Sequence, residues 1–203
     1  MSARLRKRAL GLLGAAIAVI AVGGIYIRAH PLVFNESFFG HAHCMKSAGL
    51  GLESYAADHG DRFPFHTNGY ADALILASKD GYCSDAELTG PGYKPEVLER
   101  VRKSGEHAPE NEFGRVYVQG LSCADNTKIA ILFDKIPTPG GDHCHLFRRL
   151  WAPLGREVYT IGDGMHFILE SEWPRYCREQ VALLVTAGVN RPQAEAYYYE
   201  KAK

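Results

Sequence analysis

The sequence lacks the short motifs that accompany several common kinds of catalysis. It has no G-x-G-x-x-G and no Walker-type phosphate loop, so nothing in it points to a nucleotide site. It has no Cys-x-x-Cys, so nothing in it points to a thioredoxin-type redox centre or to covalently attached c-type haem. It also has no Gly-x-Ser-x-Gly, the nucleophile turn of many serine hydrolases. The sequence therefore predicts a protein that is not an enzyme, and an envelope hydrolase is the remaining alternative.

Charge is missing from one long stretch, the 19 residues from Ala9 to Ile27. A helix of this length is about 28 Å long, close to the hydrocarbon thickness of a bilayer. Four basic residues precede the stretch and one follows it directly, which predicts a cytoplasmic N-terminus. A cleaved signal peptide is the alternative, but the residues after the stretch form a poor cleavage site. The sequence thus predicts a single transmembrane anchor in residues 1–30, placed in the inner membrane, and a periplasmic or otherwise extracytoplasmic domain in residues 31–203.

Acidic and basic residues balance over the whole chain, 23 of each, but not beyond the predicted anchor. Five basic residues and no acidic residue lie in residues 1–30, which leaves 18 basic and 23 acidic residues and a net charge of −5. A surface that binds nucleic acid needs clustered Lys and Arg. Nucleic acid is therefore not an expected partner.

The spacing of apolar residues predicts helices first, then antiparallel strands, then helices. Apolar residues at helical spacing favour a helix over residues 38–59, although Gly49 and Gly51 weaken it locally. Further helices are expected over residues 70–78, 95–103, 171–187 and 192–200, and strands over residues 115–119, 128–134, 157–161 and 165–169. Pro and Gly predict a loop at 137–141. This order is typical of an α+β domain.

A tight turn is predicted between the last two strands. Gly162, Asp163 and Gly164 separate two apolar runs, and an Asp-Gly pair in this place favours a β-hairpin with a type I′ turn. We interpret Asp163 and Gly164 as structural turn residues, and not Asp163 as the partner of Asp134 in an acid–base pair.

Two parts of the chain resemble the type II secretion pseudopilin-like family, especially its planctomycete-type members. The first is the segment His43–Pro64, in which a Cys, a Leu-Gly run, a Tyr and a Gly ahead of Pro follow in that order. The second comprises the strand segments Val116–Ser122, Ala130–Lys135 and Val158–His166. The resemblance implies a pilin-like domain, a helix laid across a small antiparallel sheet, with a structural or interaction role among envelope or secretion proteins.

The resemblance does not extend to the N-terminal processing site of the family. Processed pilins carry a Gly-Phe-Thr-Leu-x-Glu junction before the apolar run, whereas Arg8–Gly14 has no acidic residue. Pro31 also interrupts a helix that in the family continues from the anchor into the external domain. We therefore expect a pseudopilin-like protein that is not processed as a true pilin.

Two short clusters contain the residue types that bind transition metals, HAHC at 41–44 and DHCH at 142–145. Imidazole and thiolate groups suit zinc or copper. On a helix, residues 41 and 44 can face one ion, and the second cluster follows two glycines in a loop where ligands converge freely. The candidate ligands are His143, Cys144, His145, His41 and Cys44. The first expectation is a protein without a cofactor, and the alternative is an envelope protein that binds Zn or Cu.

The five cysteines add a question about disulfides. Thiols outside the cytoplasm tend to pair, and with an odd number at least one stays free or pairs between chains. The sequence does not determine the pairing. Cys44 fits the apolar stripe of the first predicted helix, so we expect it to be a buried free thiol.

Overall fold

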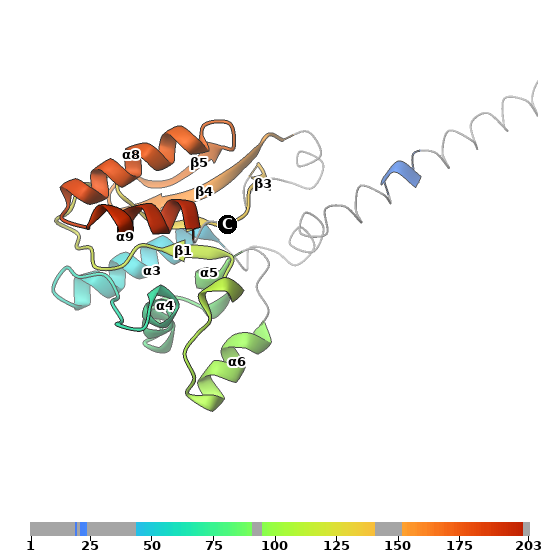
Figure 1. Cartoon of the computed structure of the whole chain (residues 1–203). Helices are drawn as coiled ribbons and strands as arrows, with labels where there is room; N and C mark the ends of the chain where they lie inside the picture. The colour runs from blue at the N-terminus through green and yellow to red at the C-terminus, as the bar shows by residue number, and fades with distance from the viewer. Residues whose placement is uncertain (1–18, 20, 24–43, 91–94, 141–151, 201–203) are drawn as a thin grey trace, which may run out of the picture.

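The computed structural model describes residues 19, 21–23, 44–90, 95–140 and 152–200, and Figure 1 shows its elements. The helices before the sheet are α3 (Met45–Asp58), α4 (Tyr70–Lys79), α5 (Asp85–Thr89), α6 (Pro95–Ser104) and the 3₁₀ turn η1 (Glu110–Glu112). The strands are β1 (Arg115–Tyr117), β2 (Ala130–Asp134), β3 (Thr138–Pro139), β4 (Leu154–Thr160) and β5 (Gly164–Leu169). The chain then forms α8 (Trp173–Thr186), α9 (Arg191–Glu195) and the π-helical turn η2 (Ala196–Glu200). The fold is α+β, in the predicted order of helices, strands and helices.

The five strands form one antiparallel sheet around β4. β2 pairs with one side of β4 near its C-terminal end, β3 pairs with the same side near its N-terminal end, and β5 pairs along the other side. β1 extends the sheet beyond β2. The register of β2 on β4 shifts between Ala130 and Leu132, which indicates a bulge at the start of β2.

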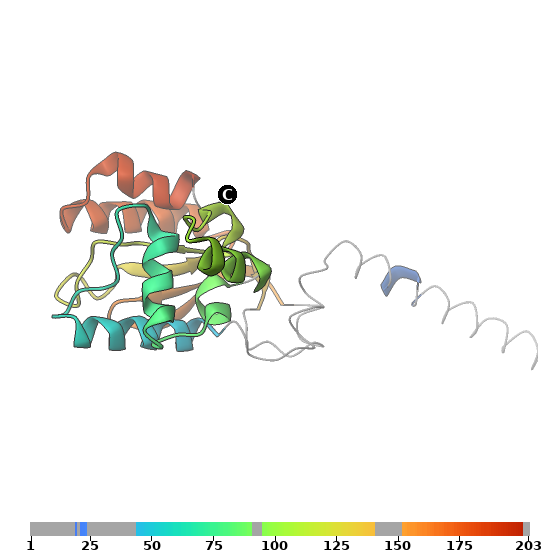
Figure 2. The ribbon, with the colours of Figure 1, turned by 90° about the horizontal axis from the view of Figure 1, so that it is seen from below.

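Helices cover both faces of this sheet. α3 contacts β2, β4 and β5 on one face, while α8, α9 and η2 lie on the other, as the two views in Figures 1 and 2 agree. Aromatic contacts join the second layer to the sheet, because the Phe133 ring of β2 stacks on Tyr198 of η2 with centroids 4.8 Å apart. Burial on both faces explains why every residue of β2 is buried and why Ala130–Phe133 is a continuous apolar run instead of an alternating one.

The packing of the first predicted helix on the sheet is confirmed. Ala48, Leu52 and Tyr55 are buried along one side of α3, as their spacing predicts. Gly49 is part of the same contact, since a Cβ on it would overlap the ring of Tyr159 on β4. Cys44 precedes the helix and is only half-buried, so its predicted place in the buried stripe is wrong, and Met45 occupies it instead.

The fold class predicted from the sequence is wrong in its transmembrane part. Within residues 19, 21–23, 44–90, 95–140 and 152–200, no helix has the length and apolar character needed to cross a membrane. Most of the predicted span 9–27, and nearly all of the predicted anchor region 1–30, lies outside the described residues. The class that the structure supports is an α+β domain with a small antiparallel sheet.

The hairpin between β4 and β5 is present, but its turn differs from the prediction. Thr160 pairs with Gly164, so the loop has three residues. Asp163 and Gly162 do not have positive φ, whereas Gly164 has a φ of 76°. A type I′ turn needs positive φ at both central residues. The predicted turn type is therefore wrong, and Gly164 is the residue that takes the left-handed backbone.

Three smaller differences separate the predicted elements from the observed ones. The predicted loop 137–141 contains β3, which exists through its pairing with β4. The short helices α5 and η1 are not predicted from the sequence. The N-cap of α8 is Glu172, one residue after the predicted start of that helix.

Candidate functional site

Most of the predicted metal ligands lie outside the described residues. This applies to His41, His143, Cys144 and His145, while Cys44 lies at the N-terminal end of α3. In the part of the chain that the structure describes, no group of three His, Cys, Asp or Glu residues is placed to hold a metal ion. The zinc or copper hypothesis therefore stays a prediction.

Three further cysteines are described, and none of them has the surroundings of a reactive thiol. Burial raises the pKa of Cys83 to about 12 and that of Cys177 to about 11, with a smaller increase at Cys83 from Glu87. Cys123 is exposed, but slight burial and the nearby carboxylates of Asp61 and Glu53 also raise its pKa. Nucleophilic cysteines need a lowered pKa.

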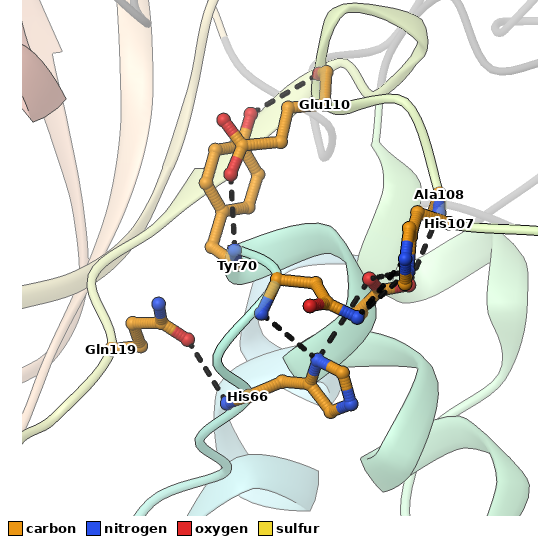
Figure 3. Close-up of polar contacts among 8 residues, drawn as sticks. His66, Tyr70, His107, Ala108, Glu110 and Gln119 are labelled. Carbon is orange, nitrogen blue, oxygen red and sulfur yellow. Dashed lines mark hydrogen bonds and ion pairs between the residues drawn. The ribbon is translucent and has the colours of Figure 1, made fainter.

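A group of titratable side chains lies where the loop before α4 meets the segment after α6. We call it the junction cluster; Figure 3 shows these contacts, which involve His66, Asn68, Tyr70, Asp72, His107 and Glu110. Asn68-Gly69 ahead of α4 and Asp72 in its first turn are ordinary signs of a helix start. Nothing in the sequence connects them to His107, which follows α6 and lies 35 positions beyond Asp72. The cluster was not predicted, because tertiary packing assembles it.

Asp72 is the centre of one half of the junction cluster. Its Oδ2 lies 3.2 Å from Nδ1 of His107 and 3.8 Å from Nδ1 of His66. Its Oδ1 accepts a hydrogen bond from the backbone N–H of Ala108 at 3.1 Å. The Asp72 side chain is 13% exposed, whereas those of His66 and His107 are 34% and 72% exposed. Solvent therefore weakens both contacts between an imidazole and the Asp72 carboxylate. The hydrogen bond from the backbone of Ala108, which is shielded from solvent, is stronger than either of them.

The two imidazoles also contact Asn68, and these contacts restrict whether each ring nitrogen donates or accepts a hydrogen bond. The backbone N–H of Asn68 donates to Nδ1 of His66 at 3.2 Å, so this nitrogen acts as an acceptor in the neutral ring. Nδ2 of Asn68 lies 2.8 Å from Nδ1 of His107. Nδ1 of His107 donates to Asp72 when it carries the proton, and accepts from Asn68 when the proton is on Nε2.

Glu110 and Tyr70 form the other half of the junction cluster. Oε1 of Glu110 accepts from the backbone N–H of Tyr70 at 3.1 Å, at the helix end where the N-cap Gly69 has no side chain to do so. The Tyr70 hydroxyl donates to the backbone oxygen of Glu110 at 3.2 Å. Burial, together with the charge of Glu110, raises the pKa of Tyr70 far above its usual value. Tyr70 is thus a neutral hydrogen-bond donor at every physiological pH.

The bonds of the cluster run in both directions between α4 and the segment that follows α6. A carboxylate of α4, Asp72, holds the backbone at Ala108, and a carboxylate of that segment, Glu110, holds the backbone at Tyr70. This arrangement fastens residues 107–110 onto the start of α4. Its chemistry is that of helix capping, with His107 as an exposed base at its rim.

Comparisons with known proteins add no relative to this picture. No protein-family model, no curated protein and no solved structure matches the chain. The resemblance to the pseudopilin-like family therefore stays a prediction that rests on the sequence segments alone.

Proposed function

We propose that this protein has a structural or protein-binding role and is not an enzyme. The observation that carries the proposal is an exposed apolar side chain at the end of the sheet where β3 meets β4. Leu154, which pairs with Pro139 of β3, is 53% exposed. The pairing of β3 with β4 fixes the backbone at Leu154, so its side chain offers a preformed apolar contact to a partner.

The junction cluster supports the proposal that the protein is not an enzyme. Asp72 and Glu110, its two carboxylates, both accept hydrogen bonds from backbone N–H groups. A general base needs a carboxylate or imidazole within reach of a substrate proton, and these carboxylates already serve the backbone. Their role in stability accounts for their arrangement.

Photo-crosslinking in the cells that make the protein tests this proposal. A photoreactive phenylalanine analogue at Leu154 should give one discrete adduct with another protein, which mass spectrometry of the purified band identifies. The matched control is the same analogue at Glu179, an exposed position on α8. Equal labelling at both positions, or none at Leu154, would reject the proposal. An adduct of twice the mass of the chain would indicate a second copy and not a separate partner.

A further inference from the structure

β5 is the outermost strand of the sheet on the side of β4 away from β2. The backbone N–H of Glu170 donates to the oxygen of Leu154, which fixes the alternation of the β4–β5 ladder. Residues 164, 166 and 168 then turn their backbone groups toward β4. Met165, Phe167 and Leu169 turn theirs outward. The backbone oxygen of Leu169 accepts a hydrogen bond from the backbone N–H of Glu172 at 2.8 Å. This oxygen is therefore not bonded to β4, in agreement with the alternation.

The other outward groups of β5 are open in the part of the chain that the structure describes. The N–H groups of Met165, Phe167 and Leu169 and the carbonyls of Met165 and Phe167 have no hydrogen-bond partner there. Proteins usually protect such an edge with a very short strand, a Lys, a Pro, a bulge or a covering element. At the opposite edge, β1 has three residues and α4 packs against it. β5 has six residues (GMHFIL) and contains no Lys and no Pro.

The sequence of β5 favours a second copy of the same strand as the occupant of this edge. An antiparallel pair related by a two-fold axis at Phe167 places Phe167 opposite its own copy and Met165 opposite Leu169. Apolar and aromatic pairs of this kind stabilise neighbouring strands. No charged residue lies in β5, and in this register Glu170 faces Gly164 of the other copy, so no like charges meet. A charged edge would oppose such self-pairing.

We propose that two copies of this chain dimerise by antiparallel pairing of β5 with β5, centred on Phe167, to form one continuous sheet. The proposal goes beyond the proposed function and does not rest on it, because dimerisation and the Leu154 adduct are separate measurements.

Charge substitution at the two-fold axis tests the proposal. Sedimentation of the full chain in a density-matched mild detergent should show a dimer at micromolar concentration. Phe167→Lys and Phe167→Glu should each raise the dimer dissociation constant by at least about tenfold, because they place like charges opposite each other. An equimolar mixture of the two variants should recover a mixed dimer. Phe65→Lys, at an exposed Phe in the loop between α3 and α4, is the matched control and should leave the dimer unchanged.

Folding of the variants is checked by circular dichroism, because the Phe167 ring lies against Gly155 of β4 and contributes to packing. A second variant avoids introducing charge. Phe167→Cys should give a disulfide-linked dimer on a non-reducing gel, since directly opposite residues are about 5.5 Å apart. Phe65→Cys should not. A monomeric wild-type chain, a dimer that survives Phe167→Lys, or a mixture that stays monomeric would overturn the proposal.

Discussion

At the scale of single residues, the most consequential feature is a buried ion pair inside the sheet. Arg115 of β1 and Asp134 of β2 are directly opposite, both side chains are 0% exposed, and Nε donates to Oδ1 at 3.1 Å. Arg115 also donates to the backbone oxygen of Glu87 at α5, and Oδ2 of Asp134 accepts from the N–H of Glu157 at 3.4 Å. The pair thus joins β1, β2, β4 and α5 at one point.

Removal of one member of this pair should be costly. Asp134→Ala leaves the guanidinium of Arg115 in a dry environment without its carboxylate, and should lower the free energy of unfolding by about 3–5 kcal/mol. The control is Arg175→Ala, which breaks a solvent-exposed pair with Glu179 and should cost less than about 0.5 kcal/mol. Urea denaturation measures both, and equal losses would contradict this account.

At the scale of elements, α3 illustrates how packing reverses a local preference. Gly49 weakens an isolated helix, and by propensity alone Gly49→Ala should stabilise the protein by about 1 kcal/mol. The ring of Tyr159 fills the space that a Cβ would take. The close approach of α3 to β4 therefore depends on this glycine.

We expect Gly49→Ala to destabilise the protein by about 1–3 kcal/mol, because overpacking exceeds the gain in propensity. Ser54→Ala, on the exposed side of the same helix, should change stability by less than about 0.5 kcal/mol. Thermal unfolding of the two variants decides between the two effects. A stabilised Gly49→Ala protein would show that α3 does not approach β4 this closely.

The short helix α5 shows an element held by its cap. Ser84 and Glu87 form a capping box, in which the backbone N–H of Ser84 donates to Glu87 at 2.8 Å. Burial raises the pKa of Glu87, but hydrogen bonds from Ser47 and Ser84 and the charge of Arg115 outweigh burial, so its pKa lies below the usual value. A lowered pKa in the folded state means that the carboxylate stabilises the fold above the pKa of the unfolded chain.

This stabilisation is lost as the pH falls through the lowered pKa of Glu87. We therefore expect wild type to exceed Glu87→Gln in stability at pH 6, and the difference to shrink as the pH is lowered from 5 to 3, around the usual pKa of about 4.3. Chemical denaturation at several pH values measures the difference. Glu179→Gln, at an exposed site, should show no such trend, and a constant difference for Glu87→Gln would refute the prediction.

At the scale of the whole molecule, the layer of α8, α9 and η2 makes the sheet an interior element. Phe133 contacts Trp173 and stacks on Tyr198, and Arg156 of β4 lies over the Trp173 ring at 4.6 Å. The C-terminal turn η2 is therefore part of the hydrophobic core and not a surface addition to it.

The neighbouring tyrosines of η2 provide a test of this role. Tyr198 is buried and Tyr199 is exposed. Tyr198→Ala should reduce the free energy of unfolding by about 3–5 kcal/mol, as for other large buried aromatic residues, whereas Tyr199→Ala should cost less than about 1 kcal/mol. Both are measured by urea denaturation. Similar small losses would mean that the sheet keeps its packing without η2.

The sequence by itself determined the kinds of elements and much of their extent. The periodicity of residues 45–58, the Pro at the start of α6 and the apolar runs of β2 and β5 are local signals, and a local signal selects helix or strand. The α+β class follows from their order, whereas the packing of the first helix on the sheet was expected only from the resemblance to the pseudopilin-like family. Gly164 was identified as a turn residue, although it is the first residue of β5, directly after a three-residue loop.

Only the tertiary structure decided which residues meet. The pairing of Asp72 with His107, of Arg115 with Asp134 and of Gly49 with Tyr159 joins positions far apart in the chain, and no local pattern encodes such contacts. β3 exists because β4 is beside it. The outward edge of β5 likewise follows from the strand order, because a strand becomes an edge only when the sheet is assembled.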